Sequence, residues 1–121
     1  MRKGTTAIAL AGAALLAACV PQVAGSWKIT AICPPQSQYG NIRIDAQADV
    51  VEIAPNVFRG TVTNNLQQRG SFDSRLDGDA LTSRITWEGL GPTESLLVFD
   101  RASGSFRGLD SNGCTLSVVR P

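Results

Sequence analysis

Apolar and polar residues alternate along most of the chain after position 24, with the period of two that is typical of half-buried β-strands. The clearest run begins at Ile42, where every second residue up to Ala48 is apolar and the residues between them are polar or charged. Val50, Val51 and Ile53 continue this run out of phase, which predicts a β-bulge within one bent strand. No segment after residue 18 keeps an apolar period of 3.6, so we expect little helix beyond a turn at 34–38.

Turn residues divide the remaining apolar runs from one another. Asp77-Gly78 and Asn112-Gly113 are dipeptides that favour tight antiparallel hairpins, and a turn is also expected at 55–56 and at 89–92. The strands expected between the turns cover residues 24–32, 41–53, 57–64, 68–76, 80–88, 94–100, 104–109 and 113–120. The sequence therefore predicts an all-β domain of eight strands.

The first 18 residues have a different pattern. Arg2 and Lys3 precede an uncharged run, rich in Ala and Leu, from Thr5 to Ala18. This is the arrangement of a secretory signal peptide, because the run is shorter than the ~20 residues that a membrane-spanning helix needs. The sequence therefore predicts that residues 1–18 are cleaved from the mature protein.

The segment Leu16-Ala17-Ala18-Cys19 resembles the lipobox of bacterial lipoproteins. In that family the cysteine thiol receives a diacylglyceryl group, and the new amino terminus is usually acylated as well. The resemblance implies that Cys19 anchors the protein to a membrane, and Val20 in place of aspartate implies the outer membrane, where we expect the periplasmic face. Residues 19–23 are then a lipidated terminus and short linker before a domain at 24–121. The five residues 20–24 span at most about 18 Å, so the domain is expected close to the headgroups.

Cys33 and Cys114 remain as an even pair in an oxidising compartment, which predicts a disulfide. It would close a loop of about 80 residues and stabilise the fold by about 4 kcal/mol in the chain-entropy model.

The two cysteines also predict how the sheet closes. If they face each other across antiparallel first and last strands, Ile29 lies opposite Val118, and apolar residues meet apolar residues along the pair. The same register places Trp27 opposite Arg120, whose guanidinium can stack on the indole. An even number of strands allows this closure in a meander, so we expect a single small up-and-down barrel.

The segment Ala24-Gly25-Ser26-Trp27, together with Arg120 near the end of the chain, resembles the Gly-x-Trp motif and terminal arginine of the calycin superfamily. Its members are small barrels that include lipocalins, avidins and bacterial inhibitors of serralysin-type metalloproteases; small alphaproteobacterial outer-membrane lipoproteins are also similar. The resemblance covers the two ends of residues 24–121. It implies a lipocalin-like barrel and, as an alternative function, protease inhibition. Those inhibitors insert a free amino-terminal segment into the protease, whereas residues 20–24 are short and acylated, so inhibition would have to use a rim loop.

Composition removes several classes of function. The chain has no histidine, which excludes Ser-His-Asp and Cys-His catalysis and His-ligated zinc, and we expect no cofactor and no metal. The formal net charge of +1 becomes −1 without Arg2 and Lys3, and the charges are scattered singly, so nucleic acid is not an expected partner. Asp73, Asp77 and Asp79 lack the ligand spacing of an EF-hand loop and are better explained as solvated charges around a hairpin.

Two further groups are candidates for catalysis. Glu88 and Glu94 flank the turn at 89–92, and a pair of carboxylates brought together is the arrangement of a glycosidase, but exposed edge charges explain them more simply. Lys28 is the only lysine after the signal peptide, and an outward solvated side chain is favoured over a dyad with a serine. The serines considered were Ser95, Ser105, Ser111 and Ser117. We therefore expect a protein that is not an enzyme.

Five aromatic residues fall on inward phases of the expected strands: Trp27, Phe58, Phe72, Trp87 and Phe106. Eight-stranded barrels either fill with side chains or hold one small ligand, and strands this short favour a filled interior. Gly60 and Gly108 relieve crowding inside or mark strand bends. The leading expectation is a lipid-anchored envelope module that contacts a protein partner through residues 34–40 and 89–93. Protease inhibition and carriage of a small apolar molecule are the alternatives.

Overall fold

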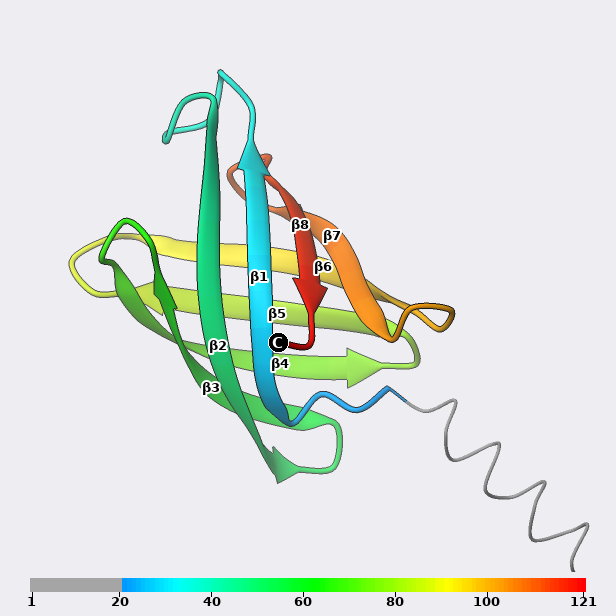
Figure 1. Ribbon diagram of the computed structural model, residues 1–121. Helices are drawn as coiled ribbons and strands as arrows, with labels where there is room; N and C mark the ends of the chain where they lie inside the picture. The colour runs from blue at the N-terminus through cyan, green and yellow to red at the C-terminus, as the bar shows by residue number, and fades with distance from the viewer. Residues whose placement is uncertain (1–20) are drawn as a thin grey trace, which may run out of the picture.

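The computed structural model describes residues 21–121, which form a closed barrel of eight antiparallel strands in chain order (Figure 1). The strands are β1 (Gly25–Cys33), β2 (Ile42–Ala54), β3 (Val57–Asn64), β4 (Arg69–Asp77), β5 (Ala80–Trp87), β6 (Pro92–Asp100), β7 (Ser105–Asp110) and β8 (Thr115–Val119). Each strand pairs with the next, and β1 also pairs with β8. The predicted all-β, up-and-down barrel is therefore confirmed.

Strand positions agree with the alternation of apolar residues to within about two residues. The bulge expected in the second strand is present, because the register between β2 and β3 shifts between Glu52 and Ala54. Two strands start two residues away from the expected position: β8 begins at Thr115 rather than at Gly113, and β6 begins at Pro92 rather than at Glu94, since Pro92 pairs with Thr86. A proline is tolerated there because the first residue of a strand need not donate to the ladder.

The seam between β1 and β8 has the register that the cysteines predict. Ile29 pairs with Val118 and Ala31 with Leu116, and the ladder ends at Lys28 and Val119. The Cys33–Cys114 disulfide lies at the other end of the same seam, joins residues 81 positions apart in the sequence, and confirms the expected pairing. Since β8 has only five strand residues, the covalent bond supplements a short ladder.

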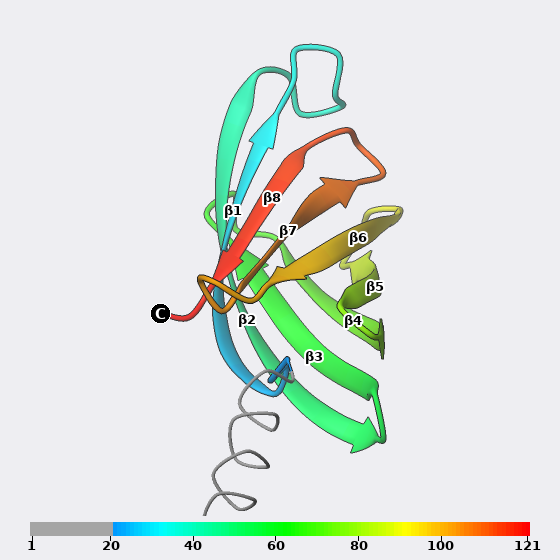
Figure 2. The ribbon, with the colours of Figure 1, turned by 90° about the vertical axis from the view of Figure 1, so that its right-hand side faces the viewer.

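The two ends of the barrel differ (Figures 1 and 2). At one end, which we call the closed end, β1 begins and the β2–β3 turn lies close by, because Gly25 pairs with Val50. At the opposite end, which we call the mouth, lie the loop between β1 and β2 and the disulfide. Ser37 and Gly40 hold that loop in successive turns by donating backbone N–H bonds to Pro34 and Ser37. The turn expected at 34–38 is thus observed, and residues 21–121 contain no helix.

Aromatic side chains pack the barrel toward its closed end. Trp27 and Phe106, 4% and 1% exposed, meet edge to face with 5.6 Å between ring centroids, and Phe99 lies 5.1 Å from Phe106. Phe58 and Phe72 are also buried, as their inward phase predicts, whereas Trp87 is only half-buried. Burial of each such ring stabilises the fold by about 1.5–3 kcal/mol.

Two inward glycines lie where strands approach closely. A Cβ at Gly108 would lie 1.8 Å from the carbonyl oxygen of Leu96, and one at Gly60 would lie 2.4 Å from both the Asp49 carbonyl oxygen and the Phe72 ring. These contacts confirm that Gly60 and Gly108 relieve crowding.

Candidate ligand-binding cavity

A cavity of about 120 Å³ runs inside the barrel above the aromatic layer. Its lining includes inward side chains from all eight strands, most of them apolar. Tyr39, Cys114 and Asn112 reach it from the mouth, while Trp27 and Phe106 form its floor near the closed end. The interior is thus filled at one end only, which differs from the filled interior that the short strands favour.

Small side chains leave this space. Ala31, Ala46 and Ala48 line the cavity from β1 and β2, at positions where a larger apolar residue would fill it. Trp27, Phe99 and Phe106 instead pack against one another at the closed end. The volume therefore arises from the distribution of side-chain size along the barrel axis rather than from strand length.

A row of polar side chains crosses the inner wall of four successive strands. Ser74 on β4 pairs with Ser83 on β5, Ser83 with Ser95 on β6, and Ser95 with Asp110 on β7. All four line the cavity. The Ser74 and Ser83 hydroxyls are 2.7 Å apart and satisfy each other, and Ser74 is 5% exposed while Asp110 at the end of β7 is only half-buried. We call these four residues the polar row; it leads from the buried wall to the mouth.

Asp110 holds the turn between β7 and β8. Its Oδ1 accepts backbone N–H bonds from Asn112 at 2.9 Å and from Cys114 at 3.0 Å. Burial raises the pKa of Asp110 above its usual 3.8, although these two donors oppose the shift. Among residues 21–121 no ion pair or hydrogen bond engages its Oδ2, so this oxygen can accept a hydrogen bond from another molecule at the cavity.

Trp87 and Thr93 close the wall beside the polar row. The Trp87 indole Nε1 donates to the Thr93 hydroxyl at 3.2 Å, and Thr93 is buried. This bond fixes the indole where β5 turns into β6, and it satisfies the one polar atom of the ring.

Trp27 and Arg120 lie together at the closed end. The Arg120 guanidinium carbon lies 3.7 Å from the centroid of the Trp27 ring. The same guanidinium donates to the carbonyl oxygens of Gln22, Ala24 and Ser26, at 2.7, 3.0 and 3.1 Å. The Trp27 indole in turn donates to the carbonyl of Val23 at 2.7 Å, so these two side chains fasten the amino-terminal segment under the barrel.

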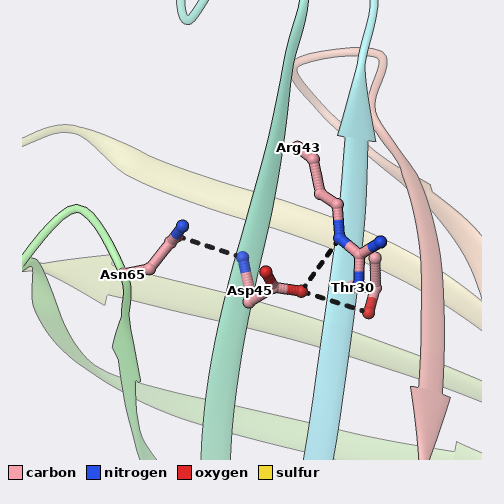
Figure 3. A network of polar contacts seen from close by, with 4 residues as sticks. All are labelled: Thr30, Arg43, Asp45 and Asn65. Carbon is pink, nitrogen blue, oxygen red and sulfur yellow. Dashed lines mark hydrogen bonds and ion pairs between the residues drawn. The ribbon is translucent and has the colours of Figure 1, made fainter.

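Apart from Asp110, the acidic side chains of residues 21–121 lie outside the cavity lining. Asp73 pairs with Arg59 at 3.1 Å, Asp79 with Arg101 at 3.3 Å, and the structure assembles no cluster of metal-ligating side chains within residues 21–121. Asp45 accepts hydrogen bonds from Arg43 and Thr30, and its backbone N–H donates to Asn65 (Figure 3). These contacts tie neighbouring strands together on the solvent side of the barrel.

The carboxylate pair and the Ser-Lys dyad are also not assembled. Glu94 pairs with Arg84 at 3.4 Å, and Glu88 lies exposed beyond the end of β5. Lys28 is exposed on β1, and no hydrogen bond joins it to a serine in the part of the chain that the structure describes. Ser95 lines the cavity instead, and Ser105 is buried against Ser103.

An apolar stripe lies on the outer wall. Leu96 on β6 pairs with Leu109 on β7, 53% and 56% exposed, and Val98 is exposed two residues from Leu96. Leu109 pairs with Thr115, which pairs with the exposed Ile32 on β1, so the stripe continues across the seam. We call this set the outer stripe. The alternation of apolar and polar residues is interrupted in β6, because Leu96 is apolar although it faces solvent, while its neighbour Leu97 is buried in the interior.

The alternation of apolar and polar residues in the sequence does not by itself indicate the polar row or the outer stripe. The signal for the row was present, because Ser74 lies in phase with Phe72 and Leu76, and Ser95 lies in phase with Leu97. Only strand pairing shows that such serines are neighbours. Cys19, predicted as the lipidated residue, lies outside the described residues, and among those described no helix has the length and apolarity to cross a membrane.

No protein-family model and no curated protein matches the chain. Among solved structures, a redesigned β-barrel is similar to it with a TM-score of 0.57 and 19% sequence identity. The match covers 81% of this chain and 90% of that one. At this identity the likeness shows the fold alone. The molecule is a small closed antiparallel barrel with an internal apolar cavity.

Proposed function

We propose that this protein is a lipid-anchored, non-catalytic barrel at the periplasmic face of the bacterial outer membrane, and that its cavity binds a small apolar molecule. The observation that carries the binding proposal is the cavity itself, lined from all eight strands by mostly apolar side chains. Small-molecule sites in proteins are typically concave and apolar, with a few placed polar groups. The cavity therefore supports carriage of a ligand, although the short strands favour an interior that is filled with side chains.

The volume limits what fits. A cavity of about 150 Å³ lined by Leu, Ile and Phe is enough to bind benzene. At about 120 Å³ this cavity suits one ring or a short aliphatic chain, with any remainder of the molecule at the mouth.

Native mass spectrometry of the purified protein, followed by titration with toluene, tests the binding. We expect a co-purifying small molecule or saturable toluene binding. The Ala46→Leu variant should abolish it by filling the cavity, while Ala54→Leu, at an exposed position, should not. Equal toluene binding by wild type and Ala46→Leu would contradict the proposal.

The anchor rests on Cys19 and the signal peptide before it. A Cys19→Ser variant is expected in the soluble fraction after membranes are washed with neutral buffer, because one or more acyl chains supply the membrane affinity. The wild-type protein, labelled with radioactive fatty acid, is the control. A Cys19→Ser protein that stays attached, or wild type without label, would refute the anchor.

The outer stripe supports a second candidate, a module that binds an envelope protein. Leu96, Leu109 and Ile32 expose apolar surface on a wall whose backbone is already fully paired. Crosslinking in native membranes should capture the same partner with wild type and with Leu66→Ser, which changes an exposed leucine between β3 and β4 outside the stripe, but not with Leu109→Ser. Capture that is unchanged by Leu109→Ser would count against this surface.

A further inference from the structure

We infer that the ligand of this cavity carries a hydrogen-bond donor, an amine or a hydroxyl, at the end that faces the mouth, and that Asp110 and Ser95 receive it. The inference rests on the proposed binding function and names the chemical class of the ligand. The occupant is then a small aromatic or short aliphatic molecule with one polar end.

The polar row divides into a satisfied part and an open part. Ser74 and Ser83 bond to each other at 2.7 Å and so offer little to a ligand. Ser95 and Asp110 are paired across β6 and β7 and line the cavity one step nearer the mouth. Within residues 21–121 no hydrogen bond engages the Ser95 hydroxyl or the Oδ2 of Asp110.

A donor on the ligand is the chemistry that these groups lack. A carboxylate only accepts hydrogen bonds, and Asp110 Oδ1 is already engaged by two backbone N–H groups. The remaining oxygen lies beside apolar walls, where an accepted hydrogen bond is stronger than in water. A ligand with only acceptors would place lone pairs against the carboxylate, and a plain hydrocarbon would leave Oδ2 without a partner when it displaced water.

The apolar part of the cavity lining determines which apolar group of a ligand fits. Ala31, Ala46 and Ala48 line it from β1 and β2, and Trp87 lines it from β5. A ring of benzene size fits the volume, and its polar substituent then reaches the mouth. Benzylamine, benzyl alcohol and toluene form a probe series that changes only this substituent.

The test compares the Kd of each probe between variants of the full lipidated protein in lipid nanodiscs. The probe partitions into the lipid equally in every sample, so partition does not affect the comparison. Binding is read from the Trp87 indole N–H resonance, because this side chain lines the cavity. In Asp110→Asn the turn keeps an oxygen acceptor but loses the charge. We expect the Kd of benzylamine to rise about tenfold, that of benzyl alcohol less, and that of toluene to stay unchanged.

Asp100→Asn is the matched control. Asp100 also holds a turn, by accepting hydrogen bonds from Ala102 and Ser103, but it lies at the closed end, away from the cavity lining. The Asp100→Asn variant should leave the Kd of all three probes unchanged. Ser95→Ala is a second variant, in which benzyl alcohol and benzylamine should both bind more weakly while toluene does not.

The outcomes separate the two proposals. The inference would be overturned if toluene and benzylamine bound wild type equally well and neither Asp110→Asn nor Ser95→Ala changed their affinities. The proposed binding function would still hold in that case. Failure of all three probes to shift Trp87 in wild type would overturn both.

Discussion

Single residues set the dimensions of the barrel interior, and Gly108 is the tightest of them. A Cβ there would lie 1.8 Å from the Leu96 carbonyl oxygen, so an alanine must push β6 and β7 apart. We expect Gly108→Ala to lower the free energy of unfolding by about 3 kcal/mol, the upper range for overpacking. Urea denaturation measures this change. Gly91→Ala, where a Cβ meets nothing within 4 Å, should stay within about 0.5 kcal/mol of wild type.

Asp110 makes stability depend on pH in the direction opposite to most carboxylates. Burial raises its pKa in the folded state above the usual 3.8, so between these two values the native protein binds more protons than the unfolded chain. The contribution of Asp110 to stability therefore increases as pH falls through the folded-state pKa, and levels off below 3.8. When wild type and Asp110→Asn are denatured at a series of pH values from 7 to 3, the free energy of unfolding of the wild type should increase relative to that of the variant as the pH falls. A relative decrease in wild-type stability as the pH falls would contradict the burial of this carboxylate.

At the scale of elements, the amino-terminal segment depends on the residue after β8. Arg120 donates to three carbonyl groups of that segment and stacks on Trp27. Arg120→Met keeps the stem but removes these bonds, and we expect a loss of about 1–2 kcal/mol, moderated because the side chain is largely exposed. Thermal denaturation should show this loss for Arg120→Met but not for Arg107→Met, which changes an exposed arginine of β7.

The seam between β1 and β8 also depends on its disulfide. Removal of both sulfurs in Cys33→Ala/Cys114→Ala opens a loop of 81 residues, which the chain-entropy model equates to a loss of about 4 kcal/mol. Chemical denaturation should show this loss, and the double variant should then be insensitive to reductant. A variant as stable as the oxidised wild type would show that the short β1–β8 ladder suffices.

The sequence predicted elements better than it predicted the site, for physical reasons. Strand phase depends on near neighbours, and the two cysteines fixed one long-range register, which is why Ile29 and Val118 could be paired correctly. Cavity volume depends on side chains from eight strands at once, so the small residues Ala46 and Ala48 looked like ordinary inward positions. Ser83 and Ser95 become neighbours only once β5 and β6 are paired.

At the scale of the whole molecule, the described chain starts at the end of the barrel opposite the mouth (Figure 2). With Cys19 in the membrane, the short segment before β1, in which Arg120 and Trp27 hold Gln22–Ala24 against the barrel, would keep the closed end near the lipid and turn the mouth toward the aqueous side. We expect a fluorophore at Asn56, in the β2–β3 turn, to transfer energy strongly to acceptors on lipid headgroups, and one at Gly40 to transfer weakly. Equal transfer from both sites would show that the barrel lies on its side.

The closed ladder has a consequence for aggregation. With β1 bonded to β8, none of the eight strands presents a free edge to another molecule. Opening this one seam exposes two edges at once, and because they are partners of each other, β1 of one copy matches β8 of the next. The same bonds that close the monomer would then join copies head to tail. The disulfide and the Arg120 contacts, which lie at opposite ends of the seam, therefore also protect the protein against self-association.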